Sequence, residues 1–222
     1  MSCNCMNWNK QNPYLAKITS KKLLSGTKSN KEVFHYEISL GDSGIIYQPG
    51  DSLGIFPVNN NTLVRAIINR LQINPTYVPQ GYDLNIYELL EKKFEILTPT
   101  NRLIKFVNDN INHNELDHSL ASKNRNILMD FKYGKDVLDF MNLDKNLNFD
   151  VLHFLTLLKP LQHRSYSIAS SNLIFKNSVH LSVSTQRWQR KNRDYGGVCS
   201  TFLSDICELG DKVNIFLIPN KL

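Results

Sequence analysis

The sequence predicts an α+β protein in which an antiparallel β-barrel carries an inserted all-helical domain. Strand-like alternation fills residues 12–61, helical spacing dominates residues 62–158, and strand patterns return over residues 159–222. Because the strands on either side need partners, we expect 12–61 and 159–222 to form one barrel. Three unrelated small pieces are the alternative, which a chain of 222 residues makes awkward. Residues 1–11 are polar, and we expect them to be disordered.

Alternation and turn residues predict the first strands. Val33 to Leu40 places apolar side chains on one face and His35 and Glu37 on the other. Ile45–Tyr47 and Leu53–Phe56 are predicted as two further short strands, separated by a turn that contains Pro and Gly. Short strands with such tight turns are typical of an antiparallel barrel or sandwich.

Apolar residues three and four positions apart predict the helices of the middle segment. Asn61 or Thr62 can cap the first of them, and Thr98-Pro99 can open another. The helical patterns lie at Leu63–Leu71, Tyr87–Phe94, Leu103–Val107, Ile127–Phe131, Val137–Met141 and Phe149–Leu158. Strands are then predicted at Ser165–Ala169, Val179–Thr185 and Val213–Ile218, with a short helix near Ser200–Cys207.

Composition excludes several classes of protein. No apolar run approaches the roughly 20 residues that a membrane-spanning helix needs, and the N-terminus lacks the apolar core of a signal peptide. We therefore expect a cytoplasmic protein with no membrane partner. Four cysteines are too few for a disulfide framework, and Cys3-x-Cys5 has no second Cys/His pair at zinc-site spacing, so no metal site is predicted.

The net charge of +6, from 26 basic and 20 acidic residues, suits an anionic ligand, an acidic partner or a nucleic acid. Lys and Asn are favoured by AT-rich codons, so this charge is a weak indication.

The first segment with chemical potential is Arg164 to Ser171, which reads Arg-Ser-Tyr-Ser-Ile-Ala-Ser-Ser. Alternation along a strand puts Arg164 and Tyr166 on one side and Ser165 and Ser167 on the other. Arg binds phosphate bidentately and Tyr stacks on rings, so the pair suits a ligand that has both. An edge strand with one exposed Arg is the simpler explanation.

The second segment is Gly196 to Leu203, where two glycines precede the start of a short helix. Free backbone amides at a helix start form an anion site, although a Ser-capped helix after a loop is equally typical of this pattern. Cys199 lies beside the helix start, where a thiol pKa can be lowered. No partner base is visible near it, so a packed thiol is favoured over a nucleophile.

Between the two segments lies a basic run, Gln186 to Arg193, that contains Trp188. It reads as a solvated hairpin, an adenine-stacking platform or a nucleic-acid contact. His163 has no Ser or Asp at triad spacing, and neither a P-loop nor a GxGxxG fingerprint is present, so no catalytic residue is predicted.

At these segments the chain resembles the FAD-binding module of diflavin reductases, most closely the sulfite reductase type. Residues Arg164 to Ser171 match the family signature RxYS(I)ASS, and Gly197 to Ser200 match GV(C/A)(S/T). The family's opening strands are matched by Asn12-Pro13-Tyr14, Gly41-Asp42-Ser43-Gly44 and Tyr47 to Gly54. The resemblance implies a six-stranded antiparallel flavin-binding barrel of the ferredoxin reductase type, with an inserted helical connecting domain and FAD as cofactor.

The resemblance also assigns site residues. The family's phosphate-binding Arg corresponds to Arg164, the Tyr that packs on the isoalloxazine ring to Tyr166, and the Ser near the reactive flavin edge to Ser167, with Ser165 between them. The remaining assignments are Gly197, Val198, Cys199 and Ser200 for the pyrophosphate, Ser182, Val183 and Ser184 for the flavin-lining strand, Trp188 for adenine stacking, and Thr100 as a weaker match. A departure is Ser184, which stands where the family has Gly.

In the family, hydride passes from NADPH to FAD, and electrons then pass singly to FMN and on to a hemoprotein. Nothing in the sequence resembles the FMN-binding flavodoxin domain or the NADPH-binding domain, and the chain stops directly after a predicted strand. We therefore expect a fragment, a truncated product or a subunit, inactive alone, with an NADPH-binding module, an FMN flavodoxin-like module and a hemoprotein subunit as partners.

Two other hypotheses remain. In the first, the chain is a vestigial or truncated FAD-binding barrel without independent redox activity. In the second, it is a basic barrel that binds nucleic acid, with Trp188 as the stacking platform. The nucleic-acid hypothesis gives the two signatures no role, so no nucleic-acid partner is predicted.

Overall fold

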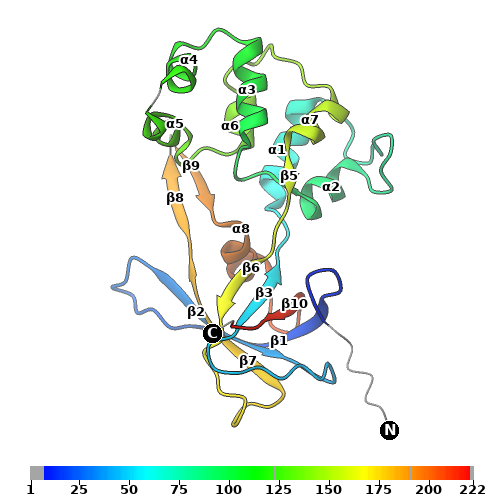
Figure 1. The fold of residues 1–222 in the computed structure, drawn as a ribbon, viewed down its shortest axis with the longest axis vertical. Helices are drawn as coiled ribbons and strands as arrows, with labels where there is room; N and C mark the ends of the chain where they lie inside the picture. The colour runs from blue at the N-terminus through cyan, green and yellow to red at the C-terminus, as the bar shows by residue number, and fades with distance from the viewer. Residues whose placement is uncertain (1–7, 123, 191, 221–222) are drawn as a thin grey trace. The chain divides into compact units, whose positions relative to one another are not determined.

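The computed structural model describes residues 8–122, 124–190 and 192–220 (Figure 1). The pair Cys3 and Cys5 lies outside these residues, as does most of the segment expected to be disordered. Residues 9–12 form a turn, and the indole N–H of Trp8 donates to the carbonyl of Ser43 at 2.8 Å.

The chain divides into two compact units, which are described separately below. The first contains residues 1–57, 162–187 and 196–222, and the second contains residues 58–161 and 188–195. The chain therefore crosses from one unit to the other four times. Within the described residues, no helix is both long and apolar enough to cross a membrane.

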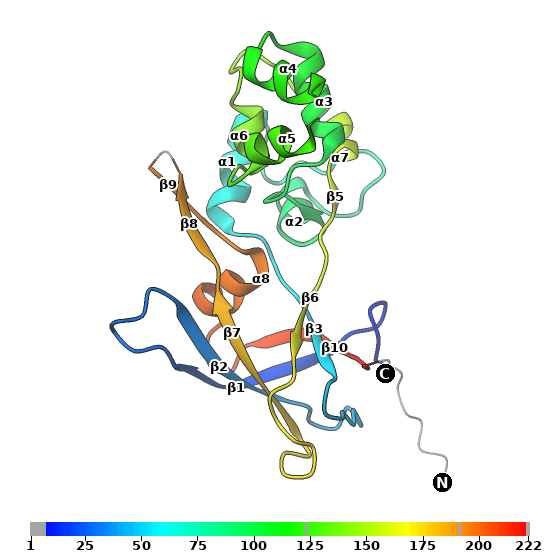
Figure 2. The same ribbon diagram turned by 60° about the vertical axis from the view of Figure 1, so that its left-hand side comes forward.

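The first unit is built on one antiparallel sheet of six strands (Figure 2). The strands run in the order β6-β3-β10-β1-β2-β7, so the last strand in sequence lies between β3 and β1. Their bounds are β1 (Tyr14–Leu23), β2 (Glu32–Ser39), β3 (Ser52–Phe56), β6 (Arg164–Ser167), β7 (Ser178–Thr185) and β10 (Lys212–Ile218). The edge strands β6 and β7 are joined by a single bridge, Ile168 to Leu181. The predicted six antiparallel strands are confirmed, but a continuous ladder that would close the sheet into a barrel is not formed.

The core of this unit lies on one face of the sheet because the strands alternate. Tyr36, Ile38 and Leu181 are fully buried there. The short helix α8 (Val198–Thr201) continues into a π-helical turn, η1 (Phe202–Ile206), which adds Phe202 and Leu203 to the buried set.

The predicted strand at Ile45–Tyr47 is wrong, since these residues form no regular structure. Tyr47 is nevertheless buried, and its hydroxyl lies 2.8 Å from the Ser170 hydroxyl and 3.1 Å from the carbonyl oxygens of Phe175 and Ser178. The segment is thus held by the Tyr47 side chain and not by backbone pairing with another strand. The sequence pattern alone cannot distinguish these two cases.

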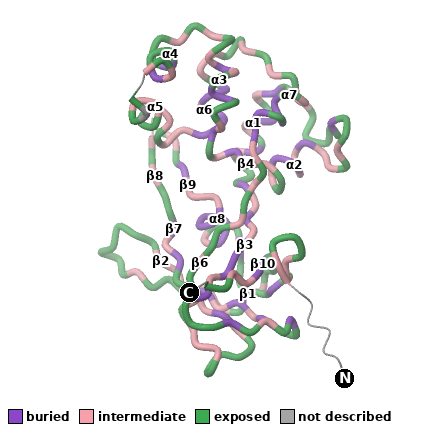
Figure 3. The backbone as a smooth tube through the Cα atoms, in the orientation of Figure 1, coloured by how far each residue is buried: buried purple, intermediate pink, exposed green. Residues whose placement is uncertain are grey.

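The second unit contains the helices, with their buried residues packed into one cluster (Figure 3). The helices are α1 (Asn61–Leu71), α2 (Ile86–Lys92), α3 (Asn101–Asn110), α4 (Asn114–Ala121), α5 (Arg125–Lys132), α6 (Val137–Met141) and α7 (Val151–Leu157). It also holds the short pair β4 (Phe94–Glu95) and β5 (Lys159–Pro160), and most of the hairpin β8 (Arg187–Arg190) and β9 (Arg193–Gly196).

Two helix starts differ from the prediction. Asn60 caps α1, because its side-chain oxygen accepts from the amides of Thr62 and Leu63. Thr100 caps α3 in place of Thr98, whose amide instead donates to the Glu95 carboxylate at 3.2 Å. Each cap lies within two residues of the predicted one, since several neighbouring side chains could serve. Helix α4 was not predicted.

Candidate functional site

Strand β6 presents Arg164 and Tyr166 as a pair. Its register on β3 sets Tyr166 opposite Leu53 and Arg164 opposite Ile55, so alternation puts both on one face. Arg164 is exposed, whereas Tyr166 is half-buried. Burial raises the pKa of the Tyr166 hydroxyl, and the Arg164 charge acts against that rise. The predicted combination of a cation and an aromatic ring is therefore present in one place.

Arg164 is an exposed cation on strand β6. Within the described part of the chain it forms no ion pair, whereas Arg187 and Arg193 each contact two carboxylates. An exposed, unpaired guanidinium held on a strand suits a phosphate group.

The two glycines before α8 are required by close packing. A Cβ at Gly196 would lie 2.3 Å from the Thr201 Cγ2 atom, and one at Gly197 would lie 2.9 Å from the Ser200 hydroxyl oxygen. The first backbone amides of any helix have no intrahelical acceptor. In α8 no side chain of the described residues caps them either, and uncapped amides at a helix start can bind an anion.

The side chain of Ser200 is engaged within the protein. Its hydroxyl accepts from the Gln186 amide and donates to the Gly197 carbonyl, both at 3.1 Å. The Ser200 hydroxyl is therefore occupied, and the prediction that this loop binds an anion through its backbone amides stays a prediction.

Tyr166 and Cys199 bring the two sequence segments together. The Tyr166 hydroxyl and the Cys199 thiol lie close enough to shift each other's pKa, and the Arg164 charge acts on both groups. The thiol also lies 3.9 Å from the Ile55 carbonyl oxygen. Strand β6 and the loop before α8, separated by some 30 residues in the sequence, are therefore neighbours.

The Cys199 thiol is a packed group. Burial raises its pKa to about 12, and the opposing effects of Tyr166 and Arg164 are smaller. The lowered pKa suggested by its place at a helix start is therefore wrong, because desolvation of the thiolate outweighs the favourable end of a four-residue helix. The packed thiol that the sequence analysis favoured is confirmed.

The three residues assigned to the flavin-lining strand do not share a face. On β7, Val183 is buried in the core, while Ser182 is exposed and Ser184 is half-buried on the opposite face. Only one of these faces can turn side chains toward a given ligand. The start of this strand lies beside the end of β6, where the Ala169 amide donates to the His180 carbonyl at 2.8 Å.

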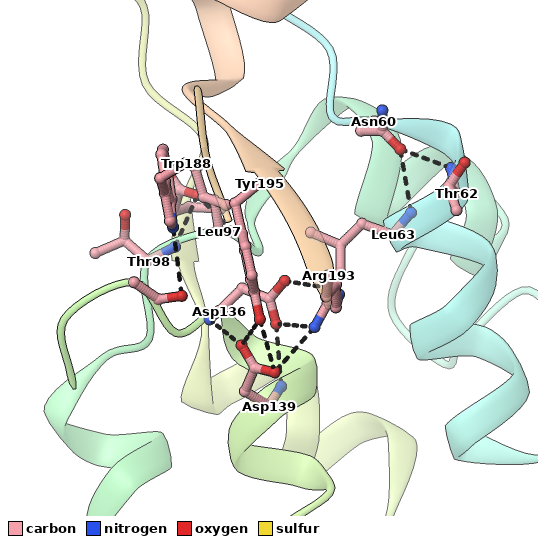
Figure 4. Close-up of polar contacts among 12 residues, drawn as sticks. Asn60, Thr62, Leu63, Leu97, Thr98, Asp136, Asp139, Trp188, Arg193 and Tyr195 are labelled. Carbon is pink, nitrogen blue, oxygen red and sulfur yellow. Dashed lines mark hydrogen bonds and ion pairs between the residues drawn. The ribbon is translucent and has the colours of Figure 1, made fainter. Parts of the chain in front are cut away.

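Trp188 and Thr100 belong to the second unit. The Trp188 ring stacks on Tyr195 with centroids 5.7 Å apart and planes 6° apart, and its indole N–H donates to the Gly134 carbonyl at 3.4 Å (Figure 4). It is half-buried, in contrast to the exposed ring that the sequence suggested. The Thr100 hydroxyl accepts from the Leu103 amide and donates to the Leu157 carbonyl, so it has a structural role.

The second unit contains a buried charge cluster that the sequence analysis did not predict. Arg193 contacts the carboxylates of both Asp136 and Asp139, and the Tyr195 hydroxyl donates to Asp139 at 2.8 Å (Figure 4). Burial and the neighbouring Asp139 raise the pKa of Asp136 to about 6, against the effect of Arg193. This cluster holds the β8–β9 hairpin on the start of α6, where Asp136 and Asp139 form a capping box. The capping box is visible in the sequence, but its arginine partner is not.

Comparison with known proteins identifies the family of the chain. The FAD binding domain family matches residues 6–85 and 85–202. The chain is 32% identical over 219 residues to the sulfite reductase [NADPH] flavoprotein alpha-component of Mannheimia succiniciproducens, covering 98% of this chain and 36% of that protein. It is 30% identical over 219 residues to the protein of the same name from Bacillus subtilis, covering 97% of this chain and 36% of the relative.

A third relative, the alpha-component from Escherichia coli O9:H4, is 31% identical over 216 residues, or 96% of this chain and 35% of that protein. The chain thus spans about a third of the length of these relatives. The family match covers most of the chain and includes both segments that Tyr166 and Cys199 bring together. The protein belongs to the FAD-binding domain family.

Proposed function

We propose that this chain is the FAD-binding electron-transfer module of a sulfite reductase-type flavoprotein. The observation that carries the proposal is the contact between Tyr166 and Cys199, which joins the Arg-Ser-Tyr-Ser strand to the loop before α8. A cation, an aromatic ring and free helix-start amides converge there in the first unit. A ligand with phosphates and a planar ring needs this combination.

The residues present fit such a cofactor. Arg164 would hold a phosphate, because it is exposed and forms no ion pair among the described residues. The amides of Val198 to Ser200 would bind the pyrophosphate, with Gly196 and Gly197 leaving no Cβ in the way of the loop.

Tyr166 would pack on the isoalloxazine ring, and Ser167 would bond near its reactive edge. Tyr166 stays a neutral phenol at physiological pH, because burial raises its pKa. Ser182 and Ser184 are the members of β7 whose side chains lie off the core, so they would contact the ligand while Val183 supports the strand from inside.

Trp188 would offer adenine the ring face that Tyr195 does not occupy. Thr100, in the second unit as well, is the weakest of the proposed ligand-binding residues, since its hydroxyl is already used to cap α3.

When bound, FAD supplies the redox chemistry, and the chain supplies binding, orientation and electrostatics. Because this chain covers about 36% of its relatives' length, the sources of reducing power and the acceptors are assigned to other modules. We propose an NADPH-binding module, an FMN flavodoxin-like module and a hemoprotein subunit as partners, all in the cytoplasm.

The nucleic-acid hypothesis is disfavoured by the charges in the basic hairpin. Arg187 pairs with Glu32 and Asp205, and Arg193 pairs with Asp136 and Asp139. Arginines held by carboxylates in this way are poorly placed to neutralise a phosphate backbone.

The test is the visible absorption spectrum of the purified chain before and after addition of FAD and desalting. We expect a retained flavin spectrum. A folded protein that stays colourless would instead support the vestigial alternative.

Arg164→Ala places the site more sharply. Loss of a charge-assisted phosphate contact, worth about 1.5–3 kcal/mol, should weaken FAD binding by roughly 10- to 150-fold. Arg65→Ala, which removes the same charge from α1, is the control and should bind FAD as the parent does. Unchanged affinity in Arg164→Ala would show that the phosphates lie elsewhere.

A further inference from the structure

His35, Glu37 and His180 lie together on the face of the β2–β7 pair that is turned away from the core. One ligand atom from each side chain lies within 4.8 Å of the other two. All three residues are half-buried, so the cluster is open to solvent on one side. They belong to the first unit and share a face of the sheet with Ser182 and Ser184, since Ser182 lies directly opposite His35, but they do not include the residues proposed to hold the flavin phosphates.

Strand geometry brings these residues together. His35 and Glu37 are two positions apart on β2 and therefore share a face, as alternation in the sequence predicts. The register sets Glu37 directly opposite His180 on β7, which makes His35 the diagonal neighbour of His180. The neighbouring residues on each strand point to the other face, where Tyr36 of β2 and Leu181 of β7 are buried.

The side chains are held in place but are not satisfied by one another. The closest approach of His35 Nε2 to Glu37 Oε1 is 3.6 Å, which is too long for a hydrogen bond. The rings of His35 and His180 meet edge to face with centroids 5.1 Å apart, and Phe175 packs on His180 at 4.1 Å. Among the described residues, the His180 ring makes one long polar contact, of 3.5 Å, between its Nε2 atom and the Ser178 hydroxyl.

Two imidazoles and a carboxylate are a ligand set that transition metals prefer. In a tetrahedral Zn²⁺ site with bonds of about 2.0–2.1 Å, neighbouring donor atoms lie about 3.3 Å apart. The distances between the donor atoms here, at most 4.8 Å, would need to shorten by at most about 1.5 Å, which rotation of the side chains can provide. The open side leaves room for water as the fourth ligand.

We propose that His35, Glu37 and His180 bind a divalent transition-metal ion, with Zn²⁺ the best match to the donor set. The ion would link β2 to β7 across their solvent-facing side. The sequence did not reveal the site because His180 follows His35 by more than 140 residues.

The test is calorimetric titration of the full chain with Zn²⁺ after removal of metal by a chelator. Thiolates also bind zinc, so the titration is made in a background in which Cys3 and Cys5 are replaced by Ser. We expect one Zn²⁺ per chain. X-ray absorption at the zinc edge should show two imidazole ligands.

His180→Ala should weaken zinc binding by more than about tenfold, since even outer-shell substitutions cost that much. Glu37→Gln keeps the shape of the side chain and removes only the charge, so it should weaken binding without disturbing the fold. His118→Ala on α4 removes an exposed histidine outside the cluster and should leave the affinity unchanged. The absence of saturable binding, or equal affinity in the parent and both cluster variants, would overturn the proposal.

Discussion

The charge cluster that anchors the β8–β9 hairpin gives the sharpest test of the structure. Arg193 contacts two carboxylates, and one of them, on Asp136, has a side chain that is only 1% exposed. Replacing Arg193 by Ala leaves a buried carboxylate without its cation. Removal of one partner from a buried pair costs 3–5 kcal/mol in general. Because the Arg193 side chain is 33% exposed, we expect the lower end, about 3 kcal/mol.

The cost should depend on pH. Asp136 has a pKa of about 6 in the folded protein, above its ordinary value of 3.8, so protonation favours the folded state. The contribution of this group to stability is therefore fully present below about pH 4 and is lost as the pH rises through 6. Without Arg193 the pKa of Asp136 should rise further. The difference in unfolding free energy between parent and variant should thus be largest near pH 8 and should shrink toward pH 4.

The measurement is urea unfolding followed by far-UV circular dichroism and by tryptophan fluorescence, to which Trp188 in the hairpin contributes. Arg187→Ala is the matched control, because its partners Glu32 and Asp205 are exposed and such pairs contribute at most about 1 kcal/mol. In an Asp136→Asn background, which keeps a side chain able to cap α6, loss of Arg193 should cost much less. Equal destabilisation by the two arginine variants, independent of pH, would refute this reasoning.

Three further predictions concern packing and buried groups. Gly196→Ala should lower the free energy of unfolding by about 1–3 kcal/mol, because the new Cβ would lie 2.3 Å from Thr201 Cγ2; Thr201→Ser in the same chain should restore most of it in thermal denaturation. Asn59→Ala should cost about 2 kcal/mol or more in urea unfolding, since the buried amide donates to two carbonyl groups at 2.7 Å each, and a neutral result would contradict those contacts. The thiols of Cys199 and Cys207, with pKa values raised to about 12 by burial, should react with a thiol reagent at pH 8 only as the protein unfolds, and rapid labelling of the folded chain would disprove their burial.

Much of the local structure could be predicted because it depends on near neighbours. The alternation predicted over Val33 to Leu40 matches β2 to within one residue at each end, and the helix predicted at Val137–Met141 has the same bounds as α6. The shared face of Arg164 and Tyr166 likewise follows from a period of two.

The failures share one physical cause, which is contact between residues far apart in the sequence. Tyr47 was predicted to lie in a strand because it belongs to an apolar run. Such a run does not show whether the segment is held by side-chain hydrogen bonds, as it is here, or by backbone pairing with another strand. The partner of Asp136 is Arg193, which follows it by 57 positions. The Trp188 ring lies in a run predicted to be solvated, because the sequence does not show that Tyr195 and Gly134 contact the ring. The size of the rise in the Cys199 pKa could not be predicted for the same reason, since burial is a tertiary property.

The place of β10 in the sheet has a consequence for folding during synthesis. This strand, Lys212–Ile218, pairs with both β3 and β1, so until it has been made the two halves of the sheet share no strand ladder and can meet only at the Ile168–Leu181 bridge. The helices α1 to α7 lie between residues 61 and 157 and depend mainly on contacts made within that stretch. Local contacts form sooner than distant ones. The nascent chain should therefore carry folded helices while the edges of β1 and β3 wait unpaired, and this interval is when a chaperone would be needed most.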